Sequence, residues 1–92
     1  MAFFIVERSL PGVGEADLIR LGRVVTHACR RLRADRVTYI GTAHVDGEAR
    51  CMCLFRAPDA TAVRRVNQIA QVSFLRINEV MRTESRDEER AD

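Results

Sequence analysis

The chain has 92 residues, a formal net charge of +2 and 47% hydrophobic residues, which suits one small globular domain. A charge this modest does not argue for nucleic acid as a partner, and no apolar run is long enough for a membrane-spanning helix. The start of the chain lacks the basic segment of a signal peptide, so we expect a soluble, cytoplasmic protein. Its odd number of cysteines, Cys29, Cys51 and Cys53, argues against a disulfide framework.

The first predicted elements are a strand over residues 2–8 and a helix over residues 17–32. The strand is apolar on both faces, a pattern typical of a strand that is covered on both sides. The helix has apolar residues at i, i+3 and i+4 spacing and arginines on its opposite face. Acidic residues at its start and arginines in its last turn match the helix dipole.

A Gly-Val-Gly turn, from Gly12 to Gly14, joins this strand to this helix and resembles a phosphate-binding loop. Glu15 follows the second glycine directly, and a carboxylate at a helix N-terminus repels an anion. We therefore expect a plain turn, in which Pro11 fixes φ and both glycines accept positive φ.

A hairpin, a second helix and a last strand are predicted for the rest of the chain. Strands over residues 37–45 and 49–56 flank the dipeptide Asp46-Gly47, which is a strong hairpin signal. Asp59 is placed to cap the second helix. The predicted buried stripe of that helix is Val63, Val66, Ile69 and Ala70, and the last strand covers residues 75–82.

The resulting order, β-α-β-β-α-β, predicts an α+β protein with a ferredoxin-like fold. In this sandwich a four-stranded antiparallel sheet carries two helices on one face. We expect the domain to span residues 1–83 and the acidic residues 84–92 to form a disordered tail.

The face of the sheet that the helices do not cover is expected to be apolar, because the first and third strands carry apolar residues on both faces. An exposed apolar patch of this kind favours a partner subunit. We therefore predict a homodimer that packs sheet against sheet, as in dimeric α+β barrels. A monomer with a few exposed apolar side chains is the alternative.

One histidine and two thiols, His44, Cys51 and Cys53, share one face of the predicted hairpin. With a two-residue turn, His44 lies opposite Ala49, and Thr42 lies opposite Cys51. Imidazole and thiolate bind soft or borderline divalent metals, so these three residues are the candidate metal ligands. Two structural alternatives remain open: buried strand cysteines, and a histidine that is hydrogen-bonded at the mouth of the hairpin.

The same face can instead line a pocket between two subunits. His44 then acts as an acid or base near neutral pH, with Tyr39 or Glu7 in support, so these three are the candidate catalytic residues. For Tyr39 and Glu7, packing and ion pairing are the alternatives. No organic cofactor is implied. RNA-recognition modules share this strand order but need stacking aromatics, and the third strand offers only Phe55, so we expect no nucleic acid partner.

Three segments resemble a family of small actinobacterial nickel-binding proteins: IVERSLPG from Ile5, CLFRAPD from Cys53 and AVRRVN from Ala62. The resemblance implies a dimeric ferredoxin-like fold, related to the dimeric α+β barrels, and divalent-metal sequestration in at least one branch. The chain departs from the family pattern at Asn67, where a histidine is usual, and at residues 71–74, where QVSF replaces a glycine–x–proline turn.

Together these features predict a small cytoplasmic homodimer that binds a ligand, with nickel or another divalent metal as the first choice. The second hypothesis is a cofactor-independent enzyme of the isomerase or cyclase type, from secondary metabolism, with its pocket between the subunits. A structural or regulatory interaction module is the third hypothesis. None of the three requires a membrane.

Overall fold

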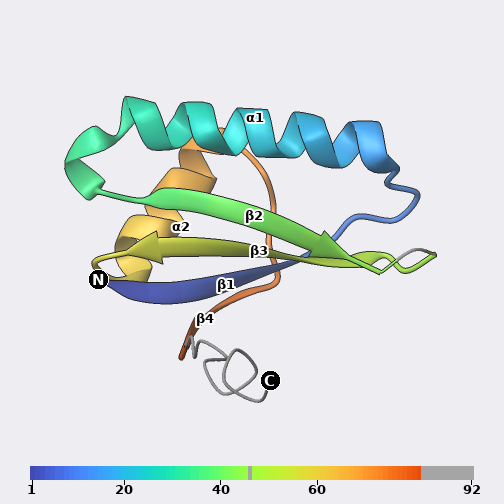
Figure 1. Ribbon diagram of the computed structural model, residues 1–92. Helices are drawn as coiled ribbons and strands as arrows, with labels where there is room; N and C mark the ends of the chain where they lie inside the picture. The colour runs from blue at the N-terminus through green and yellow to red at the C-terminus, as the bar shows by residue number, and fades with distance from the viewer. Residues whose placement is uncertain (46, 82–92) are drawn as a thin grey trace, which may run out of the picture.

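The computed structural model describes residues 1–45 and 47–81, so Arg82 and the predicted acidic tail lie outside the described residues. The elements are β1 (Ala2–Ser9), α1 (Glu15–Arg31), the short 3-10 helix η1 (Arg33–Asp35), β2 (Thr38–His44), β3 (Arg50–Ala57), α2 (Ala60–Ala70) and β4 (Arg76–Val80) (Figure 1). This confirms the predicted ferredoxin-like order. Within the described ranges, no helix is long and apolar enough to cross a membrane.

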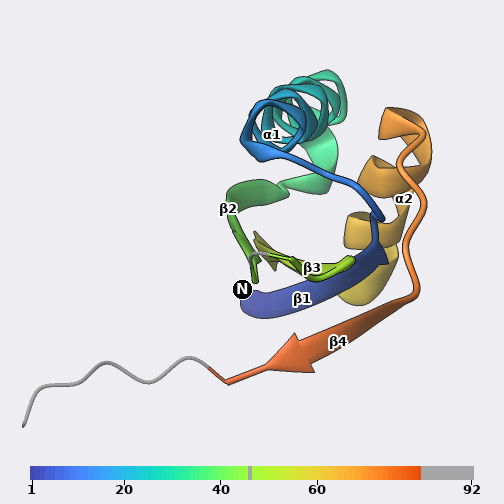
Figure 2. The ribbon, with the colours of Figure 1, turned by 90° about the vertical axis from the view of Figure 1, so that its right-hand side faces the viewer.

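The four strands form one antiparallel sheet in the order β2-β3-β1-β4, so the two most apolar strands are the central ones. Both helices lie on the same side of this sheet (Figure 2). The strand residues that face the helices form the core together with α1 and α2, and they include Phe4, Val6, Cys53 and Phe55. As predicted, the described elements leave the other face of the sheet without a covering layer.

The loop ahead of α1 is a turn, as the sequence predicts. The N–H of Val13 donates to the carbonyl of Leu10 over 3.3 Å, and Gly12 has a φ of 73°, which glycine adopts readily. Gly14 has a φ of −111°, so the expectation of positive φ is wrong for this glycine. It is instead the N-cap of α1, and its N–H donates to the Asp17 carboxylate at 3.0 Å.

The helix α2 begins at its predicted cap, because the Asp59 carboxylate accepts from the N–H of Ala62 at 2.8 Å. Its buried face differs from the prediction in one respect: Ile69 is 44% exposed, and Asn67 is fully buried. The reason is the helical period: Val66 and Asn67 follow Val63 by three and four residues, whereas Ile69 follows it by six and lies about 120° around the helix from Val63.

The pairing of β2 with β3 differs from the predicted register by two residues. His44 pairs with Cys51 and Thr42 pairs with Cys53, whereas the sequence analysis placed His44 opposite Ala49. Because side chains alternate with a period of two, a shift of two residues keeps each side chain on its predicted face. The four side chains therefore share one face, and that face is the one covered by the helices.

The connection between β2 and β3 is longer than the predicted two-residue turn. Its turn lies where the sequence predicts it, since the N–H of Glu48 donates to the carbonyl of Val45 at 2.9 Å and Gly47 has a φ of 82°. The next residue, Ala49, uses its carbonyl to accept from the N–H of Leu10 at 2.7 Å. Ala49 is thus bonded to the chain that follows β1, and pairing with β2 starts only at Cys51.

A β-bulge in β2 decides which of its side chains face the helices. Tyr39 pairs with Phe55, but the next pairing starts at Gly41, so Ile40 is the extra residue. In a regular strand, Tyr39 and Thr42 would lie on opposite faces because they are three residues apart. The bulge brings them together, and their hydroxyl oxygens lie 2.5 Å apart.

Candidate functional site

A buried polar cluster lies between the sheet and the helices, and the Arg8 side chain is its centre. Arg8 is fully buried, and it forms no ion pair with a carboxylate of residues 1–45 or 47–81. Its guanidinium donates instead to the Asn67 side-chain oxygen at 2.5 Å and to the Cys53 sulfur at 3.4 Å. It also reaches the carbonyls of Val72 and Ser73, at 3.5 and 3.4 Å. The buried positive charge of Arg8 is therefore stabilised by neutral hydrogen-bond acceptors.

The Cys53 thiol links this guanidinium to the edge strand β2. Its sulfur lies 3.1 Å from the Thr42 hydroxyl, which in turn meets the Tyr39 hydroxyl. Burial raises the pKa of Tyr39, and the hydrogen bond with Thr42 opposes that rise in part. A metal ion at the Cys53 sulfur would meet the positive charge of Arg8. The surroundings of Cys53 therefore fit a hydrogen-bonded core thiol better than a metal ligand.

His44 lies at the end of β2 and is half-buried. Its Nε2 lies 2.6 Å from the carbonyl oxygen of Glu48. Because a carbonyl only accepts, Nε2 carries the proton, and Nδ1 keeps a lone pair. This is the hydrogen-bonded histidine at the hairpin mouth that the sequence analysis left open as an alternative. The free lone pair also allows Nδ1 to bind a metal or a proton.

Cys51 is the cross-strand neighbour of His44 and is fully buried. Burial, with a further contribution from Cys53, raises the pKa of the Cys51 thiol, and the charge of Arg8 opposes this rise. The thiol is therefore neutral at neutral pH, and a metal must displace its proton.

The three candidate metal ligands thus share a face without forming one cluster. In the part of the chain that the structure describes, no three histidine, cysteine, aspartate or glutamate side chains are close enough to hold a metal ion. His44 and Cys51 are the pair that the strand register brings side by side. A metal bound there needs further ligands from solvent or from a second molecule.

The candidate catalytic residues are not brought together. Tyr39 and His44 lie on the side that faces the helices, whereas Glu7 pairs with Met52 on the open face of the sheet. The Glu7 carboxylate lies 3.2 Å from the Arg76 guanidinium and 3.8 Å from that of Arg50. Glu7 is therefore an ion-pair residue, and the sheet separates it from the other two.

The open face carries a shallow hollow of about 470 Å³, whose lining is mainly apolar. Ile5, Ile40, Met52 and Leu54 belong to it, and Ile40 and Met52 are 44% and 41% exposed. No acidic or basic side chain is part of this lining. The enzyme hypothesis expected His44 on the wall of a pocket between the subunits; this expectation needs correction, because His44 lies on the other side of the sheet.

Sequence analysis did not identify Arg8 or Asn67 as site residues. Both positions nonetheless follow the core periodicity, since Arg8 continues the buried face of Phe4 and Val6, and Asn67 lies four residues after Val63. A polar residue at a core position of each element was the signal that could have found them.

Three comparisons place the chain among known proteins. The search of curated proteins gives no match. Among solved structures, the crystal structure of SCO4226 from Streptomyces coelicolor A3(2) matches with a TM-score of 0.76, covering 90% of this chain and 100% of that chain. At 20% sequence identity, this likeness shows the fold alone. The family model described as "Nickel responsive protein SCO4226-like" matches residues 4–80, which include every helix and strand described above except the first two residues of β1. The chain therefore belongs to the SCO4226-like family.

Proposed function

We propose that this chain is a small homodimeric protein that binds a divalent metal, nickel first, with His44 as the most accessible ligand. The family description supports nickel as the metal. The observation that carries the proposal is the hydrogen bond between His44 Nε2 and the Glu48 carbonyl at 2.6 Å. Metal-binding histidines usually donate their second ring N–H to a carbonyl or carboxylate in this way, which fixes the lone pair on the other nitrogen.

Cys51 is the second proposed ligand, because it is the cross-strand partner of His44. Imidazole and thiolate together suit nickel, zinc or copper better than magnesium or calcium. Cys53 stays outside the proposed set, since its sulfur accepts from the Arg8 guanidinium. The raised pKa of Cys51 makes nickel binding release a proton, so the proposal includes a pH-dependent affinity.

The homodimer is proposed from the open face of the sheet. The helices already cover the other face, and the exposed side chains of Ile40 and Met52 leave apolar surface in water. A second copy offers the same surface, so a two-fold axis covers both patches at once. The hollow on this face has no acid or base in its lining, so it offers no proton carrier for the enzyme hypothesis.

Two measurements test the metal site. Calorimetry gives the affinity for nickel, and near-ultraviolet absorption detects the charge transfer from thiolate to nickel. His44→Ala is expected to weaken nickel binding about tenfold or more, and Cys51→Ser is expected to remove the charge-transfer absorption. The chain supplies matched controls, His27→Ala and Cys29→Ser, which change its other histidine and the cysteine outside the hairpin. Equal losses in His44→Ala and His27→Ala, or an unchanged spectrum in Cys51→Ser, would contradict the proposal.

A further inference from the structure

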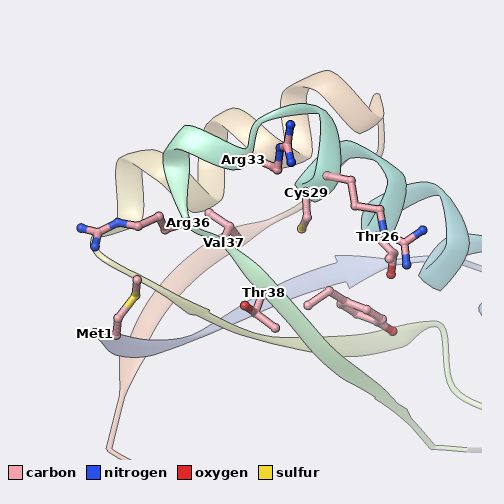
Figure 3. Close-up of a pocket in the computed structure, with 9 residues that line it drawn as sticks. Met1, Thr26, Cys29, Arg33, Arg36, Val37 and Thr38 are labelled. Atoms are coloured by element: carbon pink, nitrogen blue, oxygen red, sulfur yellow. The ribbon is translucent and has the colours of Figure 1, made fainter.

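A second concave site lies at the other end of β2 from His44. It is a pocket of about 400 Å³ between the end of α1, the helix η1 and the start of β2 (Figure 3). Thr26 and Cys29 reach it from α1, and Thr38 reaches it from β2. It shares no residue with the proposed metal ligands, so its occupancy does not depend on nickel.

Three arginines line this pocket: Arg30, Arg33 and Arg36. No lining residue is acidic, and none of the three forms an ion pair with a carboxylate of the described residues. The nearby acid in η1, Asp35, is already paired with Arg65 at 2.6 Å. Four other arginines of the described chain have carboxylate partners, and the rest, like these three, have none among the described residues. What distinguishes this pocket is that three exposed, unpaired arginines line one hollow without an acidic side chain.

The rest of the lining mixes apolar surface with neutral hydrogen-bonding groups. Val37 is buried behind the pocket, and Met1 lies at its edge. Thr26 and Thr38 add hydroxyl groups, and burial raises the pKa of the Cys29 thiol, which keeps it neutral at neutral pH. No lining residue carries a negative charge that would repel an anion. The apolar part of the lining suits the organic part of a ligand whose other end is anionic.

The backbone at Arg36 supplies a separate observation. Arg36 has a φ of 54°, a left-handed conformation that a side chain larger than hydrogen disfavours. It closes η1, because its N–H donates to the carbonyl of Arg33 at 3.1 Å. Glycine is the residue that this helix end favours for stability. Strained residues of this kind cluster at ligand-binding sites, and here the strained residue brings a positive charge to the pocket rim.

We propose that this pocket binds a small organic anion, with a phosphate or carboxylate group held by Arg30, Arg33 and Arg36 and an apolar body lying against Val37 and Met1. A guanidinium group forms bidentate hydrogen bonds with two oxygens of a phosphate or of a carboxylate. Figure 3 shows Arg33 and Arg36 extending from the turn in different directions around the rim. Their long side chains allow them to close on an anion after it enters.

Amide chemical shifts of the ¹⁵N-labelled protein, stripped of metal by a chelator and then dialysed free of the chelator, test the site without any metal. The probes are phenyl phosphate, benzoate, inorganic phosphate and benzyl alcohol. Phenyl phosphate, benzoate or both are expected to shift amides of residues 26–39 at millimolar concentration, and the stronger of the two identifies the anionic group. Inorganic phosphate alone is expected to bind more weakly, and benzyl alcohol is expected not to bind there. Shifts confined to other residues, or equal shifts with benzyl alcohol, would overturn the proposal.

Paired variants separate binding from folding. Arg33→Gln is expected to weaken the better probe about tenfold, whereas Arg31→Gln makes the same charge change outside the pocket and should leave affinity within about twofold. Arg36→Gly is expected to weaken binding without lowering the thermal midpoint, because it relieves the left-handed backbone. Gln71→Gly, at the other positive-φ site, keeps affinity unchanged. If Arg31→Gln weakens binding as much as Arg33→Gln, or a short oligonucleotide binds more tightly than both organic anions, the pocket is not the site.

Discussion

Replacing Asn67 by leucine tests how the buried charge of Arg8 is held. The Asn67 side chain accepts from the guanidinium at 2.5 Å and donates to the Val63 carbonyl at 2.8 Å. A hydrogen bond to a charged group contributes about 1.5–3 kcal/mol, and a neutral one contributes about 0.5–1.5 kcal/mol. The other acceptors of Arg8 lie at 3.4–3.5 Å and are weaker partners. We therefore expect Asn67→Leu to lower the free energy of unfolding by about 3 kcal/mol.

Urea denaturation at one fixed protein concentration measures this loss, because the stability of the proposed homodimer would depend on concentration. A loss of about 3 kcal/mol is a large part of the roughly 5–15 kcal/mol that stabilises a small domain. Asn78→Leu changes the chain's other asparagine, which is exposed on β4, and is expected not to destabilise.

The double variant Arg8→Met with Asn67→Leu tests whether the loss in Asn67→Leu comes from the unpaired charge of Arg8. It removes the buried charge together with its partner, and apolar replacement of a buried polar pair is often close to neutral. We expect the double variant to be more stable than Asn67→Leu alone. A cost below about 1 kcal/mol for Asn67→Leu, or simple addition of the two single losses, would refute this account of Arg8.

Three further predictions concern the caps and the metal. Asp59→Ala removes the acceptor for the Ala62 N–H and is expected to lower the free energy of unfolding by about 1 kcal/mol. An unchanged free energy of unfolding would show that this cap does not stabilise α2. Gln71→Gly relieves a φ of 58° at the end of α2 and is expected to stabilise by up to about 1 kcal/mol in the same urea assay; a loss would show that the left-handed backbone is not strained. Nickel affinity is expected to fall as pH falls through the neutral range, about tenfold per unit for each proton displaced, because the pKa of Cys51 is raised and the metal competes with its proton. Calorimetry at several pH values measures this, and an affinity that is independent of pH would exclude Cys51 as a ligand.

The order of the elements could be predicted because it depends on local patterns. The period of two around Phe4 and Val6, the helical period from Leu21 to Val25, and the cap at Asp59 are each legible within a few residues. The apolar open face also follows from these patterns, since a strand such as β1 carries apolar residues on both of its faces.

The details of the site could not be predicted in the same way, because they depend on contacts between distant residues. The hairpin connection is longer than a two-residue turn, so His44 pairs with Cys51, and the face of Tyr39 is decided by the extra residue Ile40. The bond between Arg8 and Asn67 joins residues 59 positions apart. Periodicity places Arg8 and Asn67 each at a core position, but it carries no information on which distant residues pair with one another.

Sedimentation equilibrium at high micromolar concentration tests the homodimer most directly. Two copies that cover the open face predict a species of twice the subunit mass of 10.4 kDa. Met52→Asp places a charge in the middle of that face, where the native side chain is 41% exposed, and is expected to give the subunit mass while the helix content stays unchanged. A single species of 10.4 kDa for the unchanged chain, or a dimer that Met52→Asp does not weaken, would contradict the proposed assembly.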